Sequence, residues 1–162
     1  MEIIFRHGWI LFIVVMIVNA FIMRRRSQAY VDINPDLKVG YDKLFKNFLI
    51  FGNIPWLIMG IGDIAGLTNG MFDFFSPQQL NPIVLTFHAC VIVLWTLGSY
   101  WIYIKDGAEF LAKHPGFFNS GEPSKTDRLN KNKVKFIWTL GMLGGIIGEI
   151  MMWNMDIPTT PF

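Results

Sequence analysis

The chain has 162 residues, of which 52% are hydrophobic and 16% are charged, and its formal net charge is +2. An ordinary soluble domain carries about 25% charged residues, so this sequence lacks the polar surface that a water-soluble protein of its size needs. The single cysteine, Cys90, excludes an intrachain disulfide and any zinc or iron–sulfur site built from cysteines of this chain alone. We therefore expect one all-α integral membrane domain over residues 1–162.

The first predicted membrane span covers residues 3–23 and is apolar apart from Arg6, His7 and Asn19. A bilayer core about 30 Å thick needs roughly 20 helical residues, which this stretch supplies. The three arginines at 24–26 follow the apolar run instead of preceding it, and no small-residue cleavage site is present. This order is opposite to that of a secretory signal, so we expect a retained helix, followed by a polar loop over 24–43.

The second predicted span covers residues 44–67. Upstream of it, Asn34 and Pro35 have the chemistry of a helix N-cap and a first helical residue. Within the span, Pro55 lacks a backbone N–H and predicts a mild kink near residues 51–55. The span also contains Asp63, a carboxylic acid that a plain lipid anchor would rarely keep.

The third and fourth predicted spans cover residues 82–104 and 136–155. Asn81 and Pro82 repeat the cap chemistry at the start of the third span. The loop between the spans covers 105–135, and its first part either prolongs the third helix or lies in the membrane interface, ending near His114, which we expect to be solvated. Residues 124–127 have capping-box spacing, which predicts that the fourth helix begins well before the membrane.

The basic residues predict the orientation of the chain. Of the 14 lysines and arginines, six lie between residues 24 and 46, seven lie between 105 and 135, and Arg6 alone lies on the other side. The positive-inside rule places both basic regions in the cytoplasm. The sequence therefore predicts an antiparallel four-helix bundle in the inner (cytoplasmic) membrane, multi-pass, with both termini on the outer side.

Each predicted span carries one acid or histidine, and such residues are costly to place in lipid. The four are His7, Asp63, His88 and Glu149. At about 1.5 Å of rise per residue, the predicted topology places all of them roughly 5–10 Å below the outer boundary of the membrane. Side chains of facing helices can converge on the axis of a four-helix bundle, so these four residues form a candidate ligand site.

Several occupants of this candidate site remain open at the level of sequence. Imidazole and carboxylate ligands suit transition metals, and His7 and His88 could instead hold one b-type haem from two sides. The residues could also form a site for a proton or a quinone headgroup. The structural alternative is that ion pairs, including pairs of Arg6 with Asp63 or Glu149, hold the bundle together.

Glycines are concentrated around the two acids. Small residues four positions apart allow helix backbones to approach closely in a membrane. We therefore expect helix-packing roles for Gly62, Gly66, Gly141, Gly144, Gly145 and Gly148. Close packing beside each acid also predicts that Asp63 and Glu149 point into protein and not into lipid.

No phosphate-binding glycine loop, nucleophile elbow or HExxH motif is present in the sequence. The sequence favours a non-catalytic membrane subunit or helper of a larger membrane complex over an enzyme. The alternative is a small-ligand membrane protein with an outer-leaflet site for a metal, b-type haem, quinone or proton. The expected partners are the lipid bilayer and other membrane subunits or further copies of the chain, but not nucleic acid, because acids are interspersed among the lysines of the basic loops.

Overall fold

A computed structural model of the chain describes residues 7–118 and 129–154, and the described part is helical, without strands. Its four long helices are α2 (Gly8–Ile33), α3 (Lys38–Ile64), α4 (Pro82–Ile104) and α6 (Lys131–Asn154). Each of them is long and apolar enough to cross a membrane. The predicted all-α fold is confirmed, and so is the presence of four helices of sufficient length and apolar character to cross a membrane.

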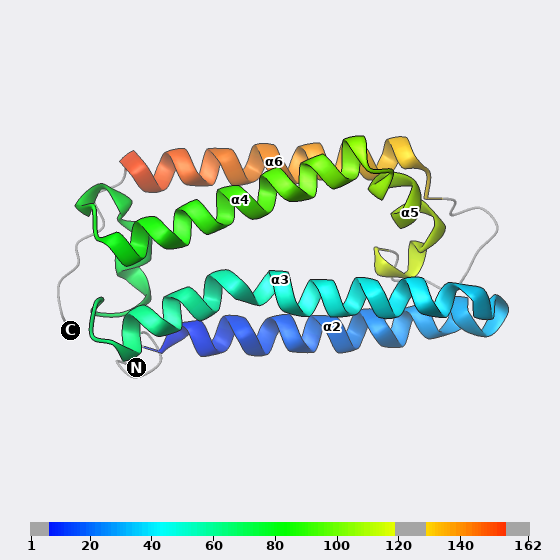
Figure 1. Cartoon of the computed structure of the whole chain (residues 1–162), viewed down its shortest axis with the longest axis horizontal. Helices are drawn as coiled ribbons and strands as arrows, with labels where there is room; N and C mark the ends of the chain where they lie inside the picture. Colours follow the sequence, from blue (N-terminus) through cyan, green and yellow to red (C-terminus); the bar gives the residue numbers. More distant parts are fainter. Residues whose placement is uncertain (1–6, 119–128, 155–162) are drawn as a thin grey trace.

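The long helices form two layers of two (Figure 1). Helices α2 and α3 lie side by side in one layer, and α4 lies beside α6 in the other. At one end, the short 3-10 helices η2 (Met71–Phe75) and η3 (Pro77–Gln79) connect α3 to α4. At the opposite end, α5 (Gly107–Lys113) and η4 (Pro115–Phe117) follow α4 and lie between the layers.

The first helix is longer than its apolar run. It continues through residues 24–33, which the sequence predicted to be loop, and the connection to α3 is short, with η1 at Pro35–Leu37. Arginine, glutamine and alanine are good helix formers, so the helix ends where Asn34 and Pro35 interrupt it and not where the polarity changes. Ser27 is buried in this extension and donates a hydrogen bond to the carbonyl oxygen of Arg24 at 2.8 Å.

Both predicted asparagine–proline helix starts are confirmed. The side chain of Asn34 accepts a hydrogen bond from the backbone N–H of Asp36 at 3.2 Å. The side chain of Asn81 accepts one from the N–H of Ile83 at 3.1 Å. Each cap satisfies one N–H that would have no partner within the helix.

The end of α3 is set by Gly66, which has a φ of +66°. Its N–H donates to the carbonyl of Asp63 at 3.1 Å, and the N–H of Leu67 donates to the carbonyl of Gly62 at 2.9 Å. These two bonds form the Schellman motif that commonly ends helices at a glycine in the left-handed region. No atom of the described residues lies within 4 Å of a Cβ built on Gly66, so within the described part this glycine terminates the helix and does not pack helices together.

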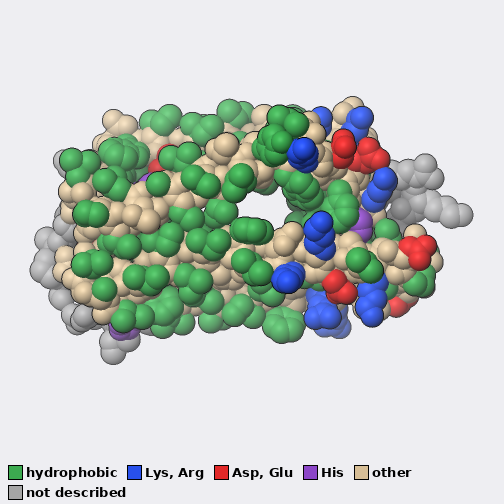
Figure 2. Space-filling model, viewed as in Figure 1, with side chains coloured by type: hydrophobic (Ala, Val, Ile, Leu, Met, Phe, Trp, Pro, Cys, Tyr) green, Lys and Arg blue, Asp and Glu red, His purple; other side chains and the backbone are tan. Residues whose placement is uncertain are grey.

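The buried apolar residues form two separate clusters, one at each end of the bundle. The cluster beside η2 contains Met59, Phe74, Val84 and Phe87. The cluster beside α5 contains Tyr41, Leu44, Phe45, Ile102, Ala108, Leu111, Leu129 and Val134. Most of the remaining apolar side chains cover the outside of the bundle, and most of the charged side chains, including all the visible lysines and arginines, gather at one end (Figure 2). This surface is what a bilayer-embedded bundle with one polar end requires.

The expectation that His114 is solvated was wrong, since this residue is 6% exposed. Its Nδ1 donates to the carbonyl oxygen of Phe110 at 2.7 Å, and its ring lies edge-on to Tyr41. A Cβ on Gly40 would collide with Nε2 of His114, so glycine at this position of α3 allows the imidazole to enter the core.

The start of the fourth helix lies at Lys131, with Asn130 accepting a hydrogen bond from the N–H of Lys133 at 2.8 Å. The predicted capping box at 124–127 lies outside the described residues. The polar part of α6 before residue 136 is therefore short, about one turn and a half at 3.6 residues per turn.

Candidate functional site

The four titratable residues predicted from the sequence lie at the η2 end of the bundle, as two histidine–carboxylate pairs. In the first pair, Nδ1 of His7 lies 2.6 Å from Oδ2 of Asp63. His7 is the residue that precedes α2, and Asp63 lies in the last turn of α3. This pair therefore joins the beginning of one helix to the end of its neighbour within the same layer.

Trp9 extends the first pair. Its indole Nε1 donates a hydrogen bond to the same Oδ2 of Asp63 at 3.0 Å. The indole ring lies against α3 at Gly60, where a Cβ would come within 2.9 Å of it. An indole nitrogen only donates, so Oδ2 of Asp63 accepts from Trp9, and it also accepts from His7 when Nδ1 of that ring carries a hydrogen.

The two members of the first pair differ in exposure. The side chain of Asp63 is 2% exposed, whereas that of His7 is 43% exposed. A buried carboxylate needs hydrogen-bond donors that replace water, and Trp9 supplies one from within the same helix pair. The contact to the exposed His7 is open to solvent or headgroups on one side.

In the second pair, Nδ1 of His88 lies 2.8 Å from Oε2 of Glu149. Nε2 of the same ring lies 2.9 Å from the carbonyl oxygen of Phe74. The side chain of His88 is 3% exposed and that of Glu149 is 13% exposed. The imidazole thus has both ring nitrogens engaged and joins three elements, α4, α6 and η2.

The two contacts of the His88 ring limit which of its nitrogens carry a hydrogen. The carbonyl oxygen of Phe74 only accepts hydrogen bonds, so Nε2 of His88 carries a hydrogen. If Nδ1 carries one as well, the ring is an imidazolium and Glu149 is a carboxylate. If Nδ1 carries none, Glu149 must be a protonated acid that donates to it. In either form one proton lies between Nδ1 and Oε2, and removing it would leave two acceptors facing each other.

Phe74 also connects the two pairs. Its ring is fully buried and lies on Gly62, where a Cβ would be 3.0 Å from Cζ of Phe74. Gly62 is the residue before Asp63, while the carbonyl of Phe74 accepts from His88. Close packing at Gly62 thus fixes the position of the acceptor on which the second pair depends.

The geometry does not gather the four residues into a single ligand set. Among residues 7–118 and 129–154, no group of three or more histidine, cysteine, aspartate or glutamate side chains is arranged to hold a metal ion. A haem ligand needs a free imidazole nitrogen, and in this arrangement both nitrogens of His88 are engaged. Arg6, considered above as a partner for either acid, lies outside the described residues.

The glycines of α6 have different surroundings. A Cβ on Gly145 would lie 2.5 Å from the ring of Trp95, so this glycine lets α4 and α6 approach. In contrast, no atom of residues 7–118 or 129–154 lies within 4 Å of a Cβ built on Gly141, Gly144 or Gly148. Within one copy of the chain, helix packing therefore involves Gly62 and Gly145, and the other four predicted packing glycines, counting Gly66, have no such neighbour in the described part.

Two parts of the site were not predicted from the sequence. In the sequence, a tryptophan near the end of a span such as Trp9 is typical of the aromatic belt at the membrane surface, and Phe74 is one of several apolar residues in a short connection, so neither is marked as part of the site. Trp9 lies two residues after His7, so its indole N–H can reach an acceptor that His7 also contacts. The spacing in the sequence does not indicate that Asp63 is this acceptor. The carbonyl of Phe74 carries no signal in the sequence at all.

Comparisons with known protein families, with curated proteins and with solved structures found no match to this chain.

Proposed function

We propose that the chain is a multi-pass protein of the inner membrane, an antiparallel four-helix bundle with both termini on the outer side. The four apolar helices support membrane insertion. Thirteen of the 14 lysines and arginines belong to the two regions that this topology assigns to the cytoplasm. With this orientation, both histidine–carboxylate pairs lie toward the outer side.

We further propose that the pair of His88 and Glu149 is a proton-binding site, and that the protein takes part in a proton-linked process of the membrane. The observation that carries this proposal is the engagement of both imidazole nitrogens, which leaves one proton between Nδ1 and Oε2. Ionisable groups inside a membrane protein commonly mark proton pathways. The partial exposure of Glu149 provides a route by which this proton is exchanged.

A second candidate function is that of a non-catalytic membrane subunit or helper in which the pairs serve only as clamps. It is favoured by the division of the four residues into two pairs, each of which ties two helices together. In this case the proton of the second pair is a permanent part of the structure and does not exchange at any pH at which the bundle is folded.

Infrared difference spectroscopy of the detergent-purified protein distinguishes the two functions. Spectra recorded between two pH values report carboxyl and imidazole bands of groups that gain or lose protons. We expect a carboxyl band that is lost in Glu149→Gln and an imidazole band that is lost in His88→Gln. Glutamine at 149 can still donate to a neutral imidazole, so the fold is kept while the shared proton is removed.

Asp63→Asn is the matched control, since it changes the other pair and should leave the Glu149 band in place. If the difference spectra of the wild type and Glu149→Gln coincide over the whole range in which both remain folded, the proton-binding proposal is overturned. The clamp function would then be retained.

A further inference from the structure

A cavity of about 470 Å³ lies at the charged end of the bundle, remote from the histidine pairs. It is bounded by α3, α4 and α5 and by the turn between the last two. Its lining residues are Lys43, Leu44, Asn47, Trp101, Lys105, Asp106, Glu109, Phe110 and Lys113. Its volume falls within the range of about 300–1,000 Å³ that small-molecule sites occupy.

The charged side chains of this cavity come from separate elements. Lys43 belongs to α3, Lys105 follows the last residue of α4, and Lys113 belongs to α5. Two acids, Asp106 and Glu109, face these three lysines, which leaves an excess of one positive charge in the lining.

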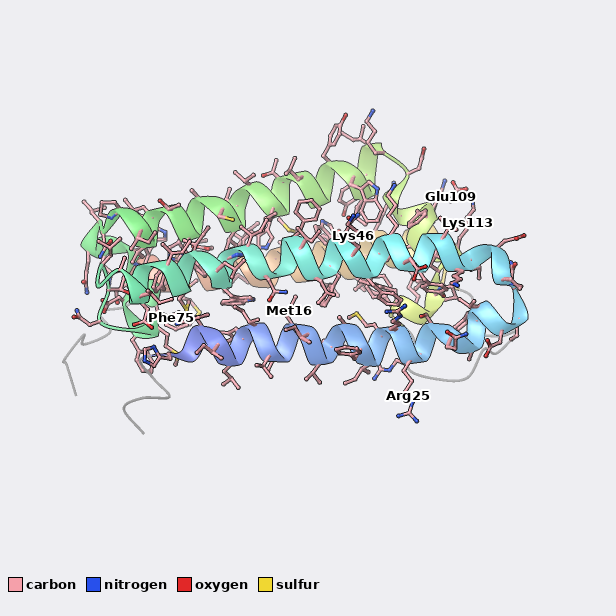
Figure 3. All side chains as sticks on the ribbon, turned by 60° about the horizontal axis from the view of Figure 1, so that its bottom comes forward. Met16, Arg25, Lys46, Phe75, Glu109 and Lys113 are labelled. Atoms are coloured by element: carbon pink, nitrogen blue, oxygen red, sulfur yellow. The ribbon has the colours of Figure 1, made fainter. Side chains whose placement is uncertain are left out.

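One of these acids is already paired. Nζ of Lys113 lies 2.9 Å from Oε1 of Glu109 within α5, where both side chains lie near each other (Figure 3). The hydrogen bond and charge of Lys113 lower the pKa of Glu109, so this acid is ionised and offsets one lysine. With this pair neutral, Lys43 and Lys105 supply the remaining positive charge of the lining, and Asp106 offsets one of the two.

The other wall of the cavity is apolar and is held in place by packing. The ring of Trp101 lies over Gly107, where a Cβ would come within 2.5 Å of it, and edge-on to Phe110. Leu44, on the facing side, is buried in the adjoining core cluster. The cavity therefore has a preformed apolar wall beside its lysines.

The space-filling view shows an opening between the two helix layers, with lysine and arginine side chains on the side of the charged end and hydrophobic side chains around the rest (Figure 2). A ligand here would have its anionic part beside the lysines and its apolar part along the lipid-facing helices. A phospholipid has this arrangement, and basic pockets between membrane helices at the cytoplasmic side are typical sites for anionic headgroups.

We propose that this cavity binds the phosphodiester headgroup of an anionic phospholipid, with Lys43 and Lys105 as its main cationic contacts and Trp101 and Phe110 beside the glycerol and upper acyl chains. The proposal requires only that the helices span a membrane. It does not depend on the proton site at the other end of the bundle, so an experiment that overturns one of these two proposals leaves the other unaffected.

Native mass spectrometry of the full chain in detergent, titrated with phosphatidylglycerol or phosphatidylcholine, tests this proposal. We expect phosphatidylglycerol to bind more tightly than phosphatidylcholine. A lysine near an anionic lipid contributes about 1 kcal/mol, so each lysine-to-glutamine change should weaken binding about fivefold. The triple variant Lys43→Gln, Lys105→Gln, Lys113→Gln should lose the preference for phosphatidylglycerol.

The matched control carries Arg25→Gln, Arg26→Gln and Lys133→Gln, which make the same change in net charge at exposed positions outside the cavity. Arg25 projects away from the helix layers (Figure 3). This variant should bind phosphatidylglycerol as the wild type does. A third variant, Glu109→Gln, removes an acid from the lining and should bind phosphatidylglycerol more tightly. This expected gain of affinity cannot be explained by misfolding of the variant.

Three results would overturn the proposal. The first is an equal loss of phosphatidylglycerol binding in the cavity triple variant and the control, which would indicate a general surface effect. The second is unchanged binding in the cavity triple variant. The third is protection of the site by soluble glycerol 3-phosphate at concentrations as low as those of the lipid, which would assign the cavity to a free phosphate compound.

Discussion

The carbonyl oxygen of Phe74 lies 2.9 Å from Nε2 of His88, and this contact fixes which nitrogen of the imidazole carries a hydrogen. Nδ1 of His88 lies 2.8 Å from Oε2 of Glu149. One proton therefore lies between these two atoms, bonded either to Nδ1 or to Oε2. A histidine with only one partner could change tautomer. His88 cannot do so without losing a bond in a site that is 3% exposed.

The first prediction concerns Glu149. Glu149→Ala leaves the buried Nδ1 of His88 without its partner, and an unsatisfied buried polar group costs about 1–3 kcal/mol. Glu149→Gln keeps a donor in the same place and should cost less than about 1 kcal/mol. Denaturant unfolding in detergent, followed by circular dichroism, measures both. Equal losses in the two variants would mean that the hydrogen bond to His88 contributes nothing measurable.

The second prediction concerns the acceptor role of Asp63. Asp63→Ala removes the acceptor of the Trp9 indole N–H and of His7, and we expect a loss of about 1–3 kcal/mol in the free energy of unfolding. Asparagine retains one side-chain oxygen for Trp9, so Asp63→Asn should be less destabilising. The same unfolding experiment measures both variants. A more severe effect of asparagine than of alanine would contradict the assigned hydrogen bonds.

The third prediction concerns Gly40. In Gly40→Ala the new methyl group collides with the buried imidazole of His114, and overpacking of this kind costs about 1–3 kcal/mol. Gly144→Ala is the matched control, because nothing lies within 4 Å of its Cβ. Alanine favours a helix over glycine by up to about 1 kcal/mol, so the control should be neutral or stabilising. A thermal melt should therefore show a lower melting temperature for Gly40→Ala and an equal or higher one for Gly144→Ala, and a melting temperature unchanged by Gly40→Ala would contradict the close contact.

The fourth prediction concerns topology. A reporter that is active only outside the cytoplasm should be active when fused after the C-terminal residue. The same reporter inserted between Phe118 and Leu129 should be silent, whereas a cytoplasmic reporter should show the reverse pattern at both positions. The reason is the distribution of lysine and arginine, which opposes translocation of the regions that carry them. Activity on the same side at both positions would contradict four crossings.

The spans were predictable because each depends on properties of a contiguous stretch. The third span was predicted at 82–104, and α4 covers Pro82–Ile104 because Asn81 and Pro82 set its start. The first span was predicted to end at residue 23, whereas α2 ends at Ile33. Hydropathy marks the part of a helix that lipid can solvate, and a helix made of good helix formers continues beyond that part.

The surroundings of individual side chains were less predictable. His114 was expected to be solvated because it lies in a polar stretch before a proline. Its burial depends on Gly40, which lies 74 positions earlier and leaves room for the ring. The glycines of α6 look equivalent in the sequence. The rotation of that helix about its axis places Gly145 against the ring of Trp95, whereas Gly144 has no neighbour within 4 Å of a built Cβ among the described residues.

The sequence by itself determined that four apolar helices form, since apolar length and cap residues are local properties. Only the tertiary structure decided that His7 meets Asp63 and His88 meets Glu149, partners that are 56 and 61 positions apart. The physical reason is that a hydrogen bond needs its atoms about 3 Å apart. A rotation of one helix about its axis, which no hydropathy pattern specifies, would separate either pair.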